Sequence, residues 1–275
     1  MTGTGPDTGT VRTGSRSRDD DARHPHDGPL LQVSDLSKRY GPTVALHPLS
    51  FTVDAGECIG IAGANGAGKS TVIALLSGIT RPSTGTIRLA GRPRSFPDPL
   101  AARNAGVETL HQKLALVDTF DVVGNFHLGR EIYRGGILAP FRVLDRARMQ
   151  QRTEQAVADL KLAIPGGVNR RVGSLSGGQR QAVAVARAAY WRSKLLLLDE
   201  PTAALGYEET AAAIDIIGRA SRAANAATIF VSHDLPLIAR LCDRVIVLRK
   251  GHHATTLDDD LTVDRLVASM TGARS

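Results

Sequence analysis

Apolar and polar positions alternate over short segments in the first part of the chain after Leu30, a pattern typical of β-strands. Turn-forming residues, among them Gly41-Pro42 and Asp54-Ala55-Gly56, separate the segments. The expected strands are residues 31–33, 44–46, 49–53 and 86–89. The N-terminal part of the chain is therefore predicted to form short strands joined by tight turns.

The pattern changes twice further along the chain. Residues from about 114 to 172 are charged, helical in pattern and interrupted by glycine and proline, which indicates an inserted helical subdomain. From Gln179 onward, helical segments alternate with apolar strands at residues 195–198, 228–231 and 244–248. Such alternation predicts an α/β fold with a largely parallel sheet, and no internal repeat is visible.

Composition is that of a globular protein. Of the 275 residues, 42% are apolar, which is enough for a core. The sequence contains no run of 18 or more apolar residues, the length needed to cross a bilayer. Residues 1–28 have almost no apolar side chains and lack the apolar segment of a signal peptide, so we expect a disordered tail before a domain at residues 29–275. Cys58 and Cys242 lie in apolar segments, which predicts buried free thiols in a protein of a reducing compartment. We do not expect a disulfide between them.

The formal net charge of +7 leaves three explanations open: a nucleic-acid partner, an anionic membrane surface, or a surface that is merely basic. The arginines are scattered along the chain, and aromatic residues make up only 4% of it. Because no stacking platform for bases is evident, we expect no nucleic-acid binding.

The stretch CIGIAGANGAGKST, from Cys58 to Thr71, places three glycines within six residues between an apolar strand and an amphipathic helix. Glycine tolerates positive φ and exposes successive N–H groups, and such a loop at a helix N-terminus binds anions. The segment matches the phosphate-binding P-loop pattern G-x-x-x-x-G-K-[ST]. The predicted phosphate contacts are Gly63, Ala64, Asn65, Gly66, Ala67, Gly68, Lys69, Ser70 and Thr71.

Two carboxylates end the apolar run Leu195–Leu198. In P-loop NTPases, an acidic residue at the end of this strand binds Mg²⁺ together with the P-loop hydroxyl. This predicts Asp199 and Ser70 as the metal ligands. Glu200 is then placed to orient or deprotonate an attacking water. Taken alone, an Asp-Glu pair is more often a solvated strand end.

The segment LSGGQ, residues 175–179, precedes a predicted helix over residues 182–190. Ser176 could simply cap that helix, and Gly177 and Gly178 could simply form a turn. The same residues with Gln179 could also bind a second phosphate through a hydroxyl, N–H groups and the helix dipole.

LSGGQ, GANGAGKST and LLLLDEPT together resemble the motifs of ABC-type ATPases, over about residues 30 to 270. The resemblance is close to ATP-binding subunits of simple-sugar importers of the ribose, fructose and xylose type. It is carried by HQKLALVDTFDVVGNFHLGRE (residues 111–131), LSGGQRQAVAVARAAY and DEPTAALG (residues 199–206). The resemblance implies a P-loop fold with a small N-terminal antiparallel β subdomain and an inserted helical subdomain.

Three further residues match family positions. Tyr40 corresponds to an aromatic residue that stacks on adenine, although by itself it could equally be a core tyrosine. Gln112 corresponds to the glutamine that reaches Mg²⁺ and the γ-phosphate, and His233 to the histidine that switches with nucleotide state. Gly206 is a departure, because most relatives have aspartate there; sugar-importer relatives share AALG, so we do not read it as loss of activity.

The resemblance implies that the P-loop of one subunit and the LSGGQ loop of another enclose the same ATP, so two copies form two sites. It implies ATP and Mg²⁺ as cofactors, a membrane permease and an extracytoplasmic sugar-binding protein as partners, and a place at the cytoplasmic face of the cell membrane. The helical subdomain near residues 112–130 would contact the permease. Import of an amino acid or a signalling furanose is an open alternative, and a soluble non-transport ABC ATPase is less favoured because residues 112–176 show no sustained heptads.

Overall fold

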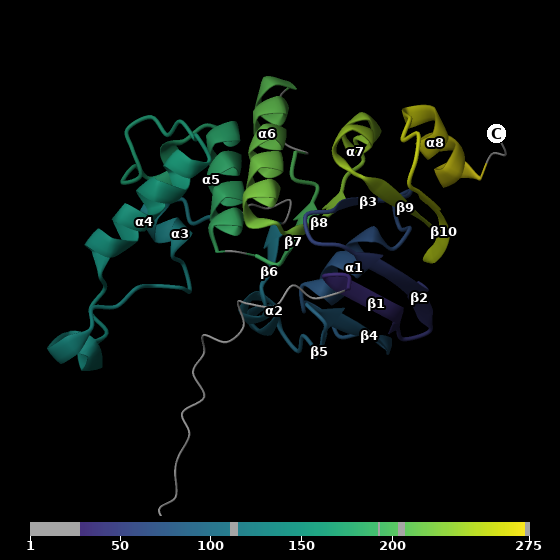
Figure 1. Ribbon diagram of the computed structural model, residues 1–275, viewed down its shortest axis with the longest axis horizontal. Helices are drawn as coiled ribbons and strands as arrows, with labels where there is room; N and C mark the ends of the chain where they lie inside the picture. Colours follow the sequence, from purple (N-terminus) through teal and green to yellow (C-terminus); the bar gives the residue numbers. More distant parts are fainter. Residues whose placement is uncertain (1–27, 111–114, 192, 203–206, 273–275) are drawn as a thin grey trace, which may run out of the picture.

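The computed structural model describes residues 28–110, 115–191, 193–202 and 207–272 (Figure 1). Within these ranges the strands form two sheets that lie one above the other, with further helices to one side (Figure 1). The chain passes from the first sheet into the second at β3 and returns to the first before it completes the second.

The first sheet is antiparallel and has the strand order β2-β1-β4-β5. Its strands are β1 (Leu31–Tyr40), β2 (Thr43–Val53), β4 (Thr84–Leu89) and β5 (Arg92–Arg94). A hairpin joins β1 to β2, with Tyr40 opposite Thr43 and with Gly41 at a φ of +56° in the turn. The alternating pattern of this region produces one buried and one exposed face, as predicted for antiparallel strands.

The second sheet is parallel except at one edge, with the order β10-β9-β3-β8-β7-β6. Its strands are β3 (Cys58–Ala62), β6 (Val107–Leu110), β7 (Leu195–Asp199), β8 (Ala227–Val231), β9 (Arg244–Arg249) and β10 (His252–Leu257). The continuous apolar runs of β7 and β8 are buried because layers cover both faces of the sheet.

Helices cover the parallel sheet on both sides (Figure 1). They are α1 (Lys69–Leu76), α2 (Pro99–Ala105), α6 (Tyr207–Ala224), α7 (Leu235–Leu241) and α8 (Val263–Thr271). In the view of Figure 1, α6, α7 and α8 lie above the parallel sheet, whereas α1 and the antiparallel sheet lie below it. The core therefore has two main clusters, one on each side of the parallel sheet.

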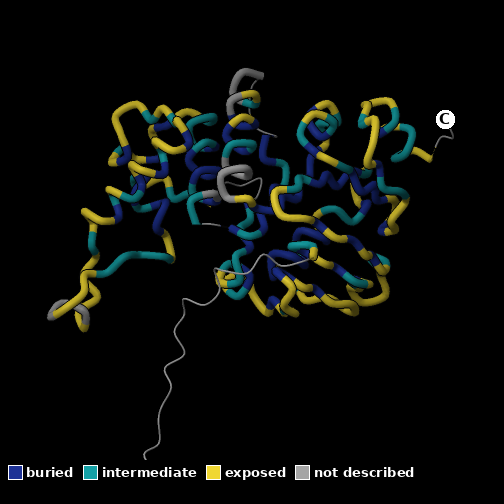
Figure 2. Tube along the Cα trace, viewed as in Figure 1, coloured by how far each residue is buried: buried dark blue, intermediate teal, exposed yellow. Residues whose placement is uncertain are grey.

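The remaining helical elements lie to one side, where α3 and α4 pack on α5 (Figure 1). They are α3 (Val122–Phe126), the 3₁₀ turn η2 (Gly136–Phe141), α4 (Arg146–Asp159), the 3₁₀ turn η3 (Val172–Ser174) and α5 (Gly177–Tyr190). Figure 2 shows their inner faces buried and the segment around η2 exposed, away from the body of the molecule. His127, Tyr190 and Trp191 form an edge-to-face aromatic cluster at the C-terminal end of α5.

Cys58 and Cys242 are free thiols whose Sγ atoms lie 3.9 Å apart. Cys242 is buried, as expected from its apolar surroundings, and Cys58 is partly exposed at the start of β3. Among the described residues, no helix has both the length and the apolar character needed to cross a membrane.

Candidate functional site

The loop between β3 and α1 is built by glycines with positive φ. Gly63 has a φ of +154°, Gly66 of +77° and Gly68 of +105°. A Cβ at Gly63 would lie 2.4 Å from the carbonyl oxygen of Leu248, so no larger residue fits beside β9. The loop therefore turns sharply from the strand into α1, which begins at Lys69.

Lys69 extends back over this loop. Its Nζ donates to the carbonyl oxygens of Gly63 at 2.7 Å and Ala64 at 3.1 Å. Partial burial lowers the pKa of the Lys69 ammonium, while the nearby carboxylates of Glu200 and Asp199 oppose that shift. The site thus holds one cation close to two anions at the mouth of a glycine loop.

A cavity of about 690 Å³ opens beside the loop. Its wall comes from five places in the sequence: the start of β2, the P-loop with the start of α1, the end of β7, the end of β8, and the β9–β10 turn. The lining residues are Thr43, Val44, Ala45, Asn65, Gly66, Ala67, Gly68, Lys69, Ser70, Thr71, Asp199, Glu200, Val231, Lys250 and Gly251. The structure therefore brings most of the predicted P-loop contacts together with both predicted carboxylates.

Glu200 follows β7 with a φ of +51°, an uncommon backbone conformation for glutamate. Its backbone N–H donates to the carbonyl oxygen of Val231 at 2.9 Å, which fixes this turn against β8. Its carboxylate Oε2 lies 2.7 Å from Nδ1 of His233, the residue predicted as the switch histidine. The His233 side chain is 73% exposed, so the ring can reorient without disturbing the core.

Two further residues predicted for the site, Tyr40 and Gln112, are not among the residues that line the cavity. Tyr40 is half exposed at the end of β1 with Lys38 Nζ 4.9 Å from its ring centre, and its hairpin partner Thr43 lines the cavity, although Tyr40 itself does not. Gln112 falls outside the described residues. Gly63 and Ala64 are not among the residues that line the cavity, and their carbonyl oxygens accept hydrogen bonds from Lys69.

The LSGGQ segment forms the N-terminus of α5 and lies apart from this cavity. Ser176 Oγ accepts from the backbone N–H of Gln179 at 3.3 Å, and Gln179 Oε1 accepts from the N–H of Ser176 at 3.1 Å. This reciprocal pair is a capping box. Ser176, Gly178 and Gln179 line a separate cavity of about 380 Å³ toward α6. In the single chain, Ser176 therefore caps α5, and its contact with a phosphate stays a prediction.

Residues 46–203 match the family model described as ABC transporter. The chain belongs to the ABC transporter family. It is 41% identical over 248 residues to the fructose import ATP-binding protein FrcA of Rhizobium meliloti, a match that covers 90% of this chain and 95% of that protein.

Two further likenesses extend this finding. The ribose import ATP-binding protein RbsA of Burkholderia pseudomallei is 40% identical over 246 residues, which cover 89% of this chain and 47% of RbsA, so the chain spans about half of that relative's length. A solved dimeric ATP-binding cassette bound to ADP and phosphate has the same fold, with a TM-score of 0.66 and 22% identity over 83% of this chain and 98% of that chain. The predicted family and fold class are confirmed, and ATP is the nucleotide expected at the cavity.

Sequence reasoning missed part of this ABC-type site. Thr43, Val44 and Ala45 from β2, and Lys250 and Gly251 from the β9–β10 turn, complete the cavity wall. Backbone bonds join these segments: the Gly251 N–H donates to Ala67 at 3.0 Å. No short motif marks them, because sheet pairing brings them to the P-loop; the Lys-Gly turn was the only local signal.

The residues of this site fit a nucleotide with a divalent cation. The glycine cradle leaves open space at Gly66, where an added Cβ would have no neighbour within 4 Å. The Ser70 hydroxyl and the Asp199 carboxylate line the same cavity and are oxygen ligands of the kind Mg²⁺ prefers. The described residues contain no group of three or more His, Cys, Asp or Glu side chains that could hold a metal ion.

Proposed function

We propose that this chain is the ATP-hydrolysing subunit of an importer that moves a sugar through a separate membrane permease. One observation carries the proposal: the chain matches 95% of the length of a fructose import ATP-binding protein at 41% identity. The P-loop cavity supports it, since Lys69, Ser70 and both carboxylates line the same cavity. The cargo itself would be bound elsewhere, by the permease and an extracytoplasmic sugar-binding protein.

The residues of the cavity divide the work of hydrolysis. The N–H groups of the P-loop and the Lys69 ammonium would bind the β- and γ-phosphates of ATP. Asp199 and Ser70, and Gln112 from outside the described residues, would hold Mg²⁺, which neutralises phosphate charge when bound. Glu200 is the proposed general base. His233, at 2.7 Å from its carboxylate, would position that base toward the attacking water.

The site needs a second copy of the chain. Ser176, Gly178 and Gln179 line a cavity different from the one lined by Lys69, so a single chain does not bring both loops to one nucleotide. In the proposed dimer, Ser176, Gly177, Gly178 and Gln179 of one copy contact the γ-phosphate held by the P-loop of the other, and Tyr40 stacks on the adenine. Closure on ATP and opening after hydrolysis would drive the permease from the cytoplasmic face of the membrane.

The test is reconstitution with a permease. The neighbouring reading frames would first be searched for a multi-span permease and a secreted sugar-binding protein. The chain would be co-expressed with such candidates, and the complex would be purified on a tag placed on the permease. We expect co-purification and ATP hydrolysis that rises when the loaded binding protein is added. A Lys69→Ala control should co-purify equally yet fail to hydrolyse ATP. Co-purification with a permease for another solute would reassign the cargo, and failure to associate with any permease would contradict the transport role.

A further inference from the structure

Two thiols lie close together where β3 begins and α7 ends, and neither lines the P-loop cavity. Cys58 is the first residue of β3, the strand that leads into the P-loop, and Cys242 directly follows α7. Their Sγ atoms are 3.9 Å apart, although 184 positions separate the two residues in the sequence. They are the two cysteines of the chain, so the fold brings together every thiol that the sequence contains.

The missing side chain of Gly60 makes room for Cys242. Cys58 and Gly60 lie on the same face of β3, because alternate residues of a strand point to the same side. A Cβ at Gly60 would lie 3.2 Å from Sγ of Cys242 and 2.9 Å from Cγ2 of Ile238 in α7. A larger residue would force α7 away from the strand, so the glycine allows the end of this helix to approach β3 closely.

Hydrogen bonds attach the residue after Cys242 to the start of β3. The backbone N–H of Asp243 donates to the carbonyl oxygen of Cys58 at 2.7 Å, and the Asp243 carboxylate accepts from the N–H of Cys58 at 2.8 Å. The next residue, Arg244, begins β9 and pairs with Ile59 of β3. These contacts fix the two thiol-bearing segments relative to each other, so the thiols are held as neighbours in the folded chain.

The two thiols differ in their access to solvent. Cys58 is partly exposed, whereas Cys242 is only 7% exposed. The hydrogen bond with Cys58, together with burial, raises the pKa of the Cys242 thiol well above its ordinary value, so this thiol stays protonated near neutral pH. A reagent in solution therefore reacts with Cys58 first, and Cys242 is in place to react with the product.

We propose that Cys58 and Cys242 form a site of reversible oxidation, at which a low-molecular-weight disulfide converts the two thiols into one disulfide bond between β3 and the end of α7. The structure describes the reduced state, in which both cysteines are free. Bonded sulfur atoms lie about 2.05 Å apart, so side-chain rotation and a small approach of the two segments must shorten the present 3.9 Å. In a reducing compartment the thiol form prevails, and the bond forms when the disulfide reagent accumulates.

The oxidation consists of two exchange steps. In the first, Cys58 loses its proton, its sulfur attacks one sulfur of the reagent, and the other half of the reagent leaves as a thiolate that takes up the proton. In the second, the sulfur of Cys242 attacks Sγ of Cys58, the bond to the reagent breaks, and the remaining half leaves with the Cys242 proton. The protein loses two hydrogen atoms and two electrons, and the reagent disulfide is reduced to two thiols.

The full-length protein, reduced and then freed of reductant, would be treated with dithiobis(nitrobenzoate), a disulfide whose released thiolate absorbs visible light. Because the chain has two cysteines, we expect two thiolates released per chain and a product that carries no reagent and has lost two hydrogen atoms by intact mass. A phosphine reductant should restore both thiols. A product that keeps the reagent on either cysteine would overturn the proposal, and so would a bond between two chains on a non-reducing gel.

Single substitutions separate the two steps. In Cys242→Ser the second step cannot occur, so this variant should release one thiolate and keep the reagent on Cys58. In Cys58→Ser the remaining thiol is only 7% exposed, so it should react at least about tenfold more slowly than the thiol of Cys242→Ser and become fast in denaturant. Equal rates for the two variants would overturn the assignment of Cys58 as the thiol that reacts first.

The melting temperature gives an independent measurement. A bond between residues 58 and 242 closes most of the chain into a loop and removes conformations from the unfolded state. The oxidised parent should therefore melt at a higher temperature than the reduced parent, whereas Cys242→Ser that carries the reagent should gain nothing. A lower melting temperature in the oxidised parent would show that the bond distorts the fold and would overturn the proposal. Melting of the reduced variants beside the reduced parent shows that each is folded.

Discussion

The two loops that resemble phosphate sites differ in how their backbone groups are engaged. In the P-loop, Gly63, Gly66 and Gly68 all have positive φ, and the open concave loop borders a cavity of about 690 Å³. In the LSGGQ loop, the backbone N–H groups of Ser176 and Gln179 each donate a hydrogen bond to the side chain of the other residue, which forms a capping box. One loop is formed in advance for a ligand, whereas the polar groups of the other are already paired within the chain.

This difference explains why one loop defines the site within a single chain and the other does not. Asp199 and Glu200 lie at the end of β7, and both line the P-loop cavity. The LSGGQ cavity is lined instead by residues of α6 and of the segment after α4, such as Asp215 and Lys161. Chemistry should therefore depend on residues beside the P-loop, and assembly on residues beside LSGGQ.

The strongest test of this division is Glu200→Gln. Glutamine keeps the size of the side chain but cannot accept a proton from water, so turnover should fall by about 10²–10⁴. Lys69, Ser70 and Asp199 remain, so ATP affinity should change little. Turnover would be measured by phosphate release and affinity by equilibrium binding. Undiminished hydrolysis would remove the base role from Glu200 and leave it as a polar strand end held by Val231 and His233.

Ser176→Arg tests the other loop. The substitution places a bulky cation where the second copy would approach, and the binding of ATP to each separate chain should be unaffected. Hydrolysis should fall about 100-fold, within the range typical for loss of transition-state contacts. Ser176→Thr is the control, because threonine retains the capping oxygen. Normal hydrolysis in Ser176→Arg would show that the segment only caps α5.

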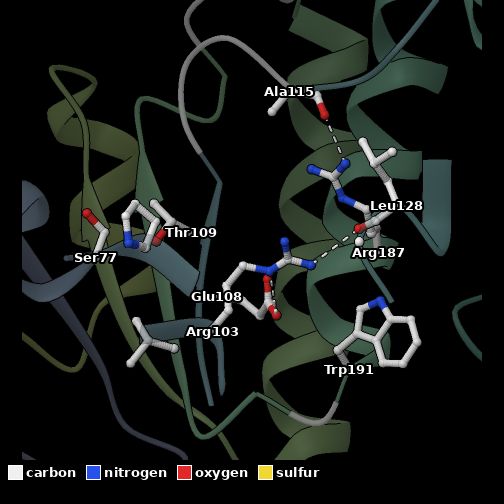
Figure 3. A pocket seen from close by; sticks show the side chains of 11 residues that line it. Ser77, Arg103, Glu108, Thr109, Ala115, Leu128, Arg187 and Trp191 are labelled. Carbon is white, nitrogen blue, oxygen red and sulfur yellow. Dashed lines mark hydrogen bonds and ion pairs between the residues drawn. The ribbon is translucent and has the colours of Figure 1, made fainter. Parts of the chain in front are cut away.

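The sequence predicted those parts of the molecule that local patterns encode. The P-loop, the carboxylates after β7 and the strands at residues 195–198 and 228–231 follow from short motifs and apolar runs. It did not predict Lys250 and Gly251 in the cavity wall, because they reach it through pairing of β9 with β3, a contact nearly 190 residues apart in sequence. For the same reason, Arg187 and Glu108, which line one pocket (Figure 3), could not be recognised as neighbours before β6, β7 and α5 were placed together.

Local rules also left Ser176 undecided, because a helix cap and an anion cradle use the same residue types. The geometry of Gln179 identifies the capping box in the single chain. The expected tail at residues 1–28 falls almost wholly outside the described residues and stays a prediction, as does the role of Gln112. The helical elements α3 and α4 do lie within residues 114–172, where charge and periodicity predicted them.

Tyr40→Ala tests how far the P-loop site extends along the β1–β2 hairpin. Stacking on a base contributes roughly 1–3 kcal/mol in other settings, so the dissociation constant for ATP should rise by about 5- to 150-fold. Turnover at saturating ATP should change less, because Tyr40 contacts no reacting atom. Tyr40→Phe keeps the ring and serves as the control. An unchanged dissociation constant in Tyr40→Ala would leave Tyr40 as a half-exposed residue beside Lys38.

The smallest expected difference between the two regions is their response to acid. His127 is fully buried, and its Nε2 lies 3.1 Å from the carbonyl oxygen of Met149. Its Nδ1 has no hydrogen-bond partner within the part of the chain that the structure describes. Burial lowers the pKa of His127 below its ordinary value of 6.5 in the folded protein. At a pH between the folded-state pKa and 6.5, the imidazole is protonated in the unfolded chain but not in the folded chain. The contribution of neutral His127 to the free energy of unfolding is therefore fully present above pH 6.5, and it is lost as the pH falls toward the folded-state pKa.

The helical side of the molecule should therefore loosen in acid before the P-loop side does. Trp191 lies edge-to-face with His127 at 5.4 Å between ring centres, so its fluorescence reports on that side, and nucleotide affinity reports on the P-loop. As the pH is lowered from 8 to 5, we expect a decrease in the melting temperature followed by Trp191 fluorescence. This decrease should be smaller in His127→Gln. His253→Gln, at an exposed position, should follow the parent. An equal acid response in His127→Gln would place the acid sensitivity elsewhere, because the buried imidazole is the only group that this variant removes.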